Sequence, residues 1–283
     1  MNDLTFDSSF SNNTVYILDG LTSSELQTAR HLSEGLSDLK YEIETPYCSI
    51  IRTDSRSSFF TALSEIKSLC IDGIRPIIHI ECHGDMNSGI TIGDKKEKIA
   101  WDELVDSFRE VNKATKNNLG IVMAGCFGLH AIKPITITKP SPFYFLIGSE
   151  GEISAGEIDE AMKSFYRALF QSDSLQTAMG QIDKRFKQFH AEKMFCISFG
   201  RYIKQKCIGK GRNARVENLL SELFENGIPR NRESLRRYRK ELKQLTRPNK
   251  AAFQKFADIF MHGRYAITYE QLHTFVTQKN NPT

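Results

Sequence analysis

Apolar residues along the first two thirds of the chain fall into two kinds of pattern. Short continuous runs rich in β-branched residues predict five strands, at about 14–19, 41–49, 75–82, 119–125 and 143–148. Apolar residues spaced three and four apart predict helices that start near Thr22 or Ser23 and near Ser55 or Ser57, and others over 101–115 and 158–170. A shorter run at 90–94 predicts one arm of a hairpin.

Strands that alternate with amphipathic helices predict right-handed crossovers and a mostly parallel sheet with helices on both faces. Residues 195–203 are either a last strand or the exit from this domain, and beyond about 205 only helical patterns remain, over 214–225, 231–246, 250–262 and 268–278. We therefore expect an α/β domain followed by a small all-α domain. The predicted boundaries are a flexible arm at 1–13, the α/β domain at 14–205, a linker at 206–213 and the helical domain at 214–283.

Composition narrows the class of protein. Of 283 residues, 25% are charged and 40% are hydrophobic, which is typical of a globular protein. No apolar run approaches the roughly 18–20 residues that cross a bilayer, and the first residues lack the basic and apolar regions of a secretory signal. Six scattered cysteines without a CxxC pair favour free thiols in a reducing compartment. We expect a cytoplasmic protein without a membrane partner.

Charge is distributed unevenly along the chain. Residues 1–200 carry 20 Lys and Arg against 27 Asp and Glu, whereas residues 201–283 carry 18 against 7. Between 230 and 250 there are nine basic residues and two acidic ones, Glu233 and Glu241. Such a run is either a solvated helix face or a surface for phosphates or an acidic partner. Tyr238 is the only aromatic residue within this run, which argues against stacking on the bases of a single strand, and no sequence-specific nucleic-acid motif is present. We interpret the tail as an adaptor domain whose partner is a substrate, an activator protein or a polyanion such as nucleic acid.

Two of the apolar runs end in residues with catalytic chemistry. The run at 75–82 leads into His83 and Gly84, and the run at 119–125 leads into Cys126. Because the carboxyl ends of parallel strands meet at one edge of a sheet, we expect the imidazole and the thiol to lie close together. They are the minimum parts of a cysteine nucleophile.

A zinc site built from His79, Cys82 and His83 is the alternative use of the first run. It lacks the paired CxxC or HxxxH ligands of zinc sites, so we expect neither a metal nor another cofactor. Alternation along a strand places Cys82 on the face opposite His79 and His83, which favours a core position for Cys82.

Four segments, taken in order, resemble the caspase-like (clan CD) cysteine peptidases, and most of all the CHAT branch, which also resembles separase. Ile-Ile-His-Ile-Glu-Cys-His-Gly at 77–84 is similar to the family strand that ends in His-Gly, and Val-Met-Ala-Gly-Cys at 122–126 to the strand that ends in the cysteine. Phe-Leu-Ile-Gly-Ser at 145–149 and Phe-Tyr-Arg-Ala-Leu at 165–169 are similar to a further strand and helix of the CHAT pattern. The resemblance covers roughly residues 14–200.

The resemblance implies a caspase-like sheet and a cysteine endopeptidase that cleaves a protein substrate. It makes Cys126 the nucleophile and His83 the acid and base, through a thioester, with the N–H groups of Gly84 and Cys126 as the oxyanion hole. Strand alternation places Glu81 and His79 on the face of His83, so either is a candidate to orient it. The family also implies a regulated pathway, such as stress response or antiviral defence.

Specificity depends on positions at which the chain departs from the family pattern. Ala124 stands where caspases have Gln, and the acidic loop at 149–154 lacks the Trp and Asp usual in CHAT proteins. Asp19, Glu150 and Glu152 lie on segments expected near the cleft and are candidates for an S1 pocket that holds a basic residue. The alternative function is a catalytically silent caspase-like scaffold that binds nucleic acid or a protein partner through its basic helical tail.

Overall fold

The structure, a computed structural model, describes residues 10–278 and divides them into two units. Residues 10–191 with 259–264 form the sheet unit, and residues 192–258 with 265–278 form the helical unit. The division falls before the predicted boundary near residue 205. Of the predicted arm at 1–13, residues 1–9 lie outside the described residues, whereas Phe10 stacks on Tyr144 with ring centroids 5.8 Å apart.

The sheet unit is built on a six-stranded sheet of order β2–β1–β3–β7–β8–β9. Its strands are β1 (Thr14–Asp19), β2 (Tyr47–Arg52), β3 (Pro76–Glu81), β7 (Gly120–Ala124), β8 (Phe145–Ser149) and β9 (Phe186–His190). All neighbours are parallel except β8 and β9. Every residue of β1 and β3 is buried, as expected for central strands covered on both faces. The predicted mostly parallel α/β sheet is confirmed.

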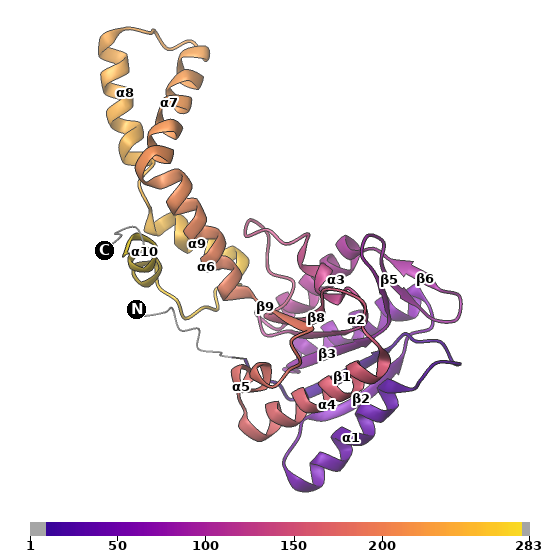
Figure 1. Cartoon of the computed structure of the whole chain (residues 1–283). Coiled ribbons are helices and arrows are strands. Elements are labelled where there is room, and N and C mark those ends of the chain that lie inside the picture. The colour runs from indigo at the N-terminus through magenta and orange to yellow at the C-terminus, as the bar shows by residue number, and fades with distance from the viewer. Residues whose placement is uncertain (1–9, 279–283) are drawn as a thin grey trace. The chain divides into compact units, whose positions relative to one another are not determined.

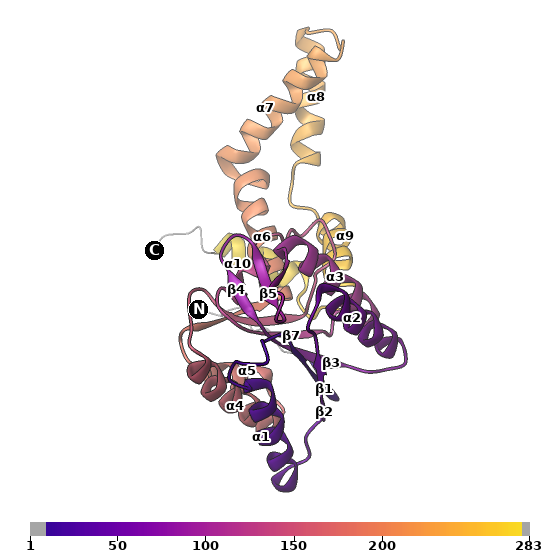
Figure 2. The ribbon, with the colours of Figure 1, turned by 90° about the vertical axis from the view of Figure 1, so that its right-hand side faces the viewer.

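Helices flank this sheet on both faces. They are α1 (Thr28–Glu42), α2 (Arg56–Ile71), α3 (Trp101–Ala114), α4 (Ala155–Ser172) and α5 (Leu175–Gly180). Helices α1, α4 and α5 lie on one face, and α2 and α3 lie on the other (Figures 1 and 2). Buried side chains of α1, α4 and α5 form one continuous apolar core with those of β1 and β3. A 3-10 helix, η1 (Gly128–Ile132), follows the end of β7.

A second, three-stranded antiparallel sheet follows β3 directly. It consists of β4 (His83–Asp85), β5 (Gly89–Ile92) and β6 (Glu97–Ile99). The predicted hairpin arm at 90–94 corresponds to β5. The backbone N–H of Gly93 donates to the carbonyl of Gly20 over 2.8 Å, so the end of β5 is held against the loop that follows β1.

Two predicted starts of helices have different outcomes. Ser55 caps α2 as predicted. Helix α1, however, begins at Thr28 rather than after Thr22 or Ser23. Its predicted cap is used inside the preceding loop, where the Thr22 N–H donates to the Glu25 carboxylate over 2.6 Å.

The helical unit contains the helices that the tail sequence predicts, preceded by one that it does not. They are α6 (Ala191–Tyr202), α7 (Gly209–Glu225), α8 (Arg232–Leu245), α9 (Lys250–Phe260) and α10 (Tyr269–Gln278). Phe195, Phe199 and Phe253 pack together with ring centroids 5.3 to 5.6 Å apart. Within residues 10–278, no helix has both the length and the apolar character needed to cross a membrane.

Two sequence interpretations of the middle of the chain are wrong, and one strand there is not predicted. The expected linker at 206–213 is helical, because a π-helical turn at Ile203–Cys207 leads into α7 at Gly209. The strand considered at 195–203 is part of α6. Strand β9 is missed because its Phe-Lys-Gln-Phe-His sequence buries only the two Phe side chains, as an edge strand can.

Candidate active site

The candidate site lies where two neighbouring strands end. Strand β3 ends at Glu81, and the chain turns at the buried Cys82 into β4, which begins with His83. Strand β7 is the parallel neighbour of β3, and its last residue, Ala124, is in register with Glu81. Cys126 follows in the turn after β7. The predicted meeting of the two strand ends is therefore confirmed.

Two glycines let the turns after β3 and β7 touch. A Cβ atom on Gly84 would lie 1.8 Å from the carbonyl oxygen of Cys126, and one on Gly125 would lie 2.3 Å from the carbonyl oxygen of Cys82. Both obstacles are backbone atoms, so a side chain at either position would have to displace a strand end. Because neither glycine has a side chain, the backbone next to His83 can contact the backbone of Cys126.

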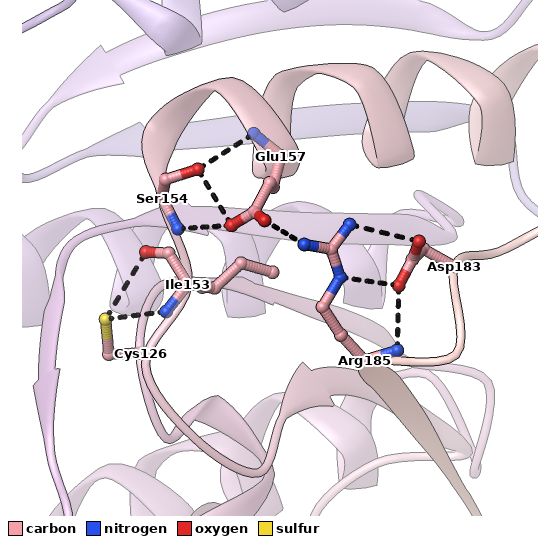
Figure 3. A network of polar contacts seen from close by, with 6 residues as sticks. All are labelled: Cys126, Ile153, Ser154, Glu157, Asp183 and Arg185. Carbon is pink, nitrogen blue, oxygen red and sulfur yellow. Dashed lines mark hydrogen bonds and ion pairs between the residues drawn. The ribbon is translucent and has the colours of Figure 1, made fainter.

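The sulfur of Cys126 is held by the residue that precedes α4. The Ile153 N–H donates to Sγ over 3.4 Å, and the thiol lies 3.6 Å from the Ile153 carbonyl oxygen (Figure 3). The next residue, Ser154, caps α4 in a capping box with Glu157. The sulfur thus lies beside a backbone N–H donor just before the start of α4.

Further hydrogen bonds connect the turn at Cys126 to this loop. The Ser149 hydroxyl lies 3.0 Å from the Gly125 carbonyl oxygen and 2.9 Å from that of Gly151. The Phe127 N–H also donates to the Gly151 carbonyl, over 3.0 Å. Phe127 has a φ of 57°, a left-handed conformation that is uncommon for a bulky side chain. Backbone strain of this kind concentrates at functional sites.

His83 is held by a carboxylate from the loop between β1 and α1. Its Nε2 lies 2.5 Å from Oε1 of Glu25, and the His83 and Glu25 side chains are 56% and 31% exposed. Partial burial disfavours the charged form of Glu25, but hydrogen bonds from Thr22 and the adjacent His83 outweigh it, so the pKa of Glu25 lies below its usual value. The ionised Glu25 accepts the Nε2 hydrogen, which leaves Nδ1 as the basic nitrogen.

Sequence reasoning misses Glu25, although one signal was available. Thr22 and Glu25 have the spacing of a helix capping box, a signal that the prediction of the helix start did not use. The same pairing occurs in the structure as an isolated turn, in which the Glu25 N–H also donates to the Thr22 carbonyl over 3.2 Å. This turn presents the carboxylate to His83.

The expectation that His79 or Glu81 orients His83 is wrong. Both ring nitrogens of His79 have other partners: Nδ1 lies 3.2 Å from the Tyr166 hydroxyl, and Nε2 lies 3.0 Å from Oε1 of Glu81. Oε2 of Glu81 accepts from the Thr28 hydroxyl over 2.9 Å. The alternation argument fails because β3 ends at Glu81 and His83 belongs to a different sheet.

Hydrogen bonds connect four buried side chains in a row, from Tyr166 through His79 and Glu81 to Thr28. His79, Glu81, Tyr166 and Thr28 are each less than 5% exposed. Burial, with smaller contributions from Cys48 and Glu81, holds the pKa of Tyr166 well above its usual range, so its hydroxyl stays protonated. We call this set the buried polar chain.

Two hollows meet at Cys126. The first, which we call the apolar cavity, has a volume of about 260 Å³, and both Cys126 and His83 border it. Its apolar wall consists of Leu21, Leu26, Ala124, Ile153, Ala155 and Ile158. The second, which we call the acidic hollow, is more open and has a volume of about 530 Å³. Cys126 and Gly84 border it together with Asp85, Glu152 and Glu157.

The structure separates the three candidate S1 carboxylates. Glu152 borders the acidic hollow. Glu150 is exposed and borders neither hollow. Asp19 is buried and accepts from Arg52 over 2.7 Å and from the Leu21 N–H over 3.2 Å, so its charge is already paired. Of the three, only Glu152 is placed beside Cys126.

Three of the other thiols, those of Cys70, Cys82 and Cys196, are more deeply buried than that of Cys126. Burial raises the pKa of Cys70 and of Cys196 to about 12, and it also raises that of Cys82 above its usual value. The expected core position of Cys82 is confirmed. Cys126 is half-exposed.

Comparison with known proteins adds no family to this geometry, since neither a scan against family models nor a search of curated proteins finds a match. In the described part of the chain, no three His, Cys, Asp or Glu side chains are grouped so that they could hold a metal ion. His79, Cys82 and His83 are therefore not arranged as the ligands of a zinc site in this part of the chain.

Proposed function

We propose that this chain is a cysteine endopeptidase of the caspase-like type, with Cys126 as nucleophile and His83 as general acid and base. One observation carries the proposal: both residues border the apolar cavity, and each is held by a separate partner. Glu25 holds the imidazole, and the Ile153 N–H holds the sulfur. These contacts fix the orientation of the thiol and of the imidazole, between which the proposed reaction transfers a proton.

In the acylation step, the Cys126 thiolate attacks the carbonyl carbon of the scissile peptide bond, and the C=O electron pair moves to oxygen. The N–H groups of Gly84 and Cys126 are the proposed donors to this oxyanion, and both residues border the acidic hollow. One such donor contributes about 3 kcal/mol to transition-state stabilisation. When the C–N bond breaks, His83 gives the amine the proton that it took from the thiol. A thioester on Cys126 remains.

In the deacylation step, water attacks the thioester carbon while His83 accepts a proton from the water. The C–S bond then breaks, and His83 returns the proton to the sulfur. The carboxylate of Glu25 stabilises the imidazolium that forms in each half of the cycle. One water is consumed for each peptide bond, and the thiol is restored.

The acidic hollow is the proposed binding site for a basic P1 residue. Hydrogen bonds from the Ser88 and Asn87 backbone lower the pKa of Asp85, so this carboxylate is ionised at neutral pH. Arg185 pairs with Glu157 and compensates part of its charge. Asp85 and Glu152 therefore supply the charge for a Lys or Arg side chain. We expect Glu152→Gln to reduce cleavage after basic residues about two- to five-fold, the range for an exposed charge pair.

The decisive experiment compares protein N-termini, by mass spectrometry, in cells that produce the wild type or Cys126→Ala. New termini that appear only with the wild type, preceded by Lys or Arg, are the expected result, and His83→Ala should remove them as well. Identical termini from folded wild-type and variant protein would overturn the peptidase. Termini preceded by apolar residues would keep the peptidase but move S1 to the apolar cavity.

The second candidate function is a catalytically silent scaffold that acts through its tail. It is favoured by the exposure of α8, in which no residue is buried. Cleavage of any protein that depends on the Cys126 thiol would exclude it.

A further inference from the structure

Helix α8 carries basic side chains along one side. Arg232, Arg236, Lys240 and Lys243 are exposed, and they follow one another at intervals of four, four and three residues. At 3.6 residues per turn, these positions fall within an arc of about 80° and extend along roughly 16 Å of helix. We call these four residues the basic stripe. Arg247, just beyond the end of the helix, is also exposed.

The other side of α8 faces its neighbour in the hairpin. Leu235, Tyr238 and Leu242 share this side and are partly buried, and α7 and α8 run side by side (Figure 1). Arg239, at the edge of this side, donates to both carboxylate oxygens of Glu217 in α7 over 2.9 and 2.7 Å. The hairpin thus uses the apolar side for its own packing and leaves the basic stripe in solvent.

The charge of the basic stripe is not neutralised by an ion pair. Among the ion pairs of residues 10–278, the two that involve the basic run and its end use Arg239 and Lys250, and none uses a member of the stripe. Glu217 attracts Lys243 as well, but its carboxylate is already bonded to Arg239. The stripe is therefore a line of positive charges, none of which has an ion-pair partner among residues 10–278.

We propose that the basic stripe binds the phosphate backbone of a nucleic-acid duplex without reading its sequence. A duplex carries one negative charge per about 1.7 Å of axis when both strands are counted, so roughly 16 Å of duplex contains about ten phosphates, more than the four side chains of the stripe need. The guanidinium groups of Arg232 and Arg236 can each donate two parallel hydrogen bonds to a phosphate. Contacts of this kind position a protein on the duplex but carry no sequence information.

An acidic protein fits the stripe less well than a duplex does. Protein interfaces depend on apolar or aromatic anchors near their centre. The exposed side chains that border the stripe are polar or charged: Glu233, Arg237 and Gln244. Leu245, which is 74% exposed, lies on a different side of the helix. The surface therefore offers charge without an anchor, which is the composition of a phosphate-binding face.

The test measures binding of the full chain, as Cys126→Ala, to short fluorescent DNA duplexes of two unrelated sequences at several salt concentrations. Four phosphate contacts predict a slope of about −3.6 for log affinity against log salt, and thus about a 150-fold loss of affinity between 50 and 200 mM. The double variant Arg236→Gln with Lys240→Gln should reduce the slope to about −1.8. The two sequences should bind equally, and an RNA duplex run in parallel distinguishes the two sources of a phosphate backbone.

The matched control is Arg237→Gln with Arg239→Gln, which removes the same charge from the same helix outside the stripe. It should change the affinity at 50 mM salt less than about three-fold. Equal losses in both double variants would show that net charge, not the stripe, controls binding, and would overturn the proposal. So would equally tight binding of polyglutamate, or no binding at low salt. Because the Cys126→Ala chain is used, the result does not depend on whether the protein is a peptidase.

Discussion

Replacing Glu25 by Gln isolates the contribution of one negative charge to the proposed chemistry. The substitution keeps the size of the side chain and an oxygen that can accept the hydrogen on Nε2 of His83. In the wild type this nitrogen lies 2.5 Å from Oε1 of Glu25. What it removes is the charge that stabilises the imidazolium during both halves of the reaction. The expected effect is therefore on the rate of the chemical step and not on folding or on substrate binding.

The size of the expected decrease in kcat follows from how exposed the His83 and Glu25 side chains are. With the two charge centres about 4 Å apart, the attraction is about 1 kcal/mol in water and about 4 kcal/mol at an effective dielectric constant of 20. Because His83 is 56% exposed and Glu25 is 31% exposed, the value lies near the aqueous limit. We take about 1–2 kcal/mol, which corresponds to about a 5- to 30-fold decrease in kcat.

The assay is steady-state cleavage of a peptide chosen from the cellular N-termini. We expect kcat to fall for Glu25→Gln while KM and the melting temperature stay close to the wild-type values, and Glu25→Asp should restore part of the rate. The control is Glu34→Gln, which removes an exposed carboxylate paired with Arg30 on α1. An unchanged kcat in Glu25→Gln, together with complete loss in Cys126→Ala, would refute the positioning role.

The effect of Glu25→Gln on the reaction rate should depend on pH, and the direction follows from the lowered pKa of Glu25. The pKa of Glu25 lies below the ordinary Glu value of 4.5, so the carboxylate is charged throughout the neutral range. Its contribution is present above that value and is lost as the pH falls through the lowered pKa. The ratio of wild-type to Glu25→Gln rates should therefore be constant at neutral pH and approach one only below pH 4.5.

The remaining predictions concern packing and thiol reactivity. Gly84→Ala should abolish activity and lower the free energy of unfolding by about 1–3 kcal/mol, because the added Cβ would overlap the Cys126 carbonyl oxygen. In the same thermal unfolding assay Gly156→Ala should not destabilise the protein, since the space around Gly156 is open. Tyr166→Phe should destabilise by about 1–3 kcal/mol, since it leaves a buried nitrogen of His79 without its partner. In a peptide map of the native protein, iodoacetamide at neutral pH should label Cys126 first. Labelling of Cys70, Cys82 and Cys196 should be much slower, because burial raises the pKa of their thiols and keeps them protonated.

The meeting of the turns that carry the thiol and the imidazole could be predicted because it depends on the order of the strands in the main sheet. Each follows a run of buried apolar residues, and consecutive buried runs with a crossover between them become parallel neighbours. The register of Glu81 opposite Ala124 then brings the two turns together. Gly84 and Gly125 were visible in the sequence, but their role as contact points depends on a backbone approach that only the tertiary structure shows.

The partners of the site residues could not be predicted in the same way. Glu25 and Ile153 lie far from His83 and Cys126 in sequence, and each is placed by a loop whose path depends on tertiary contacts. The sequence suggested the nearest polar residues of β3 instead. That suggestion assumed that the strand continues to His83, whereas the chain leaves the sheet at Cys82.

The buried polar chain gives His79 and Glu81 a different relation to the site. Through Thr28 it ties the start of α1 to β3, and through Tyr166 it ties α4 to the same strand. Helix α1 begins after the loop that carries Glu25, and α4 begins after the Ser154 cap that follows Ile153. Each polar group in this chain has a partner, so its burial costs little and the geometry it imposes is specific. We infer that His79 and Glu81 position the partners of His83 and Cys126, without contacting the reacting groups themselves.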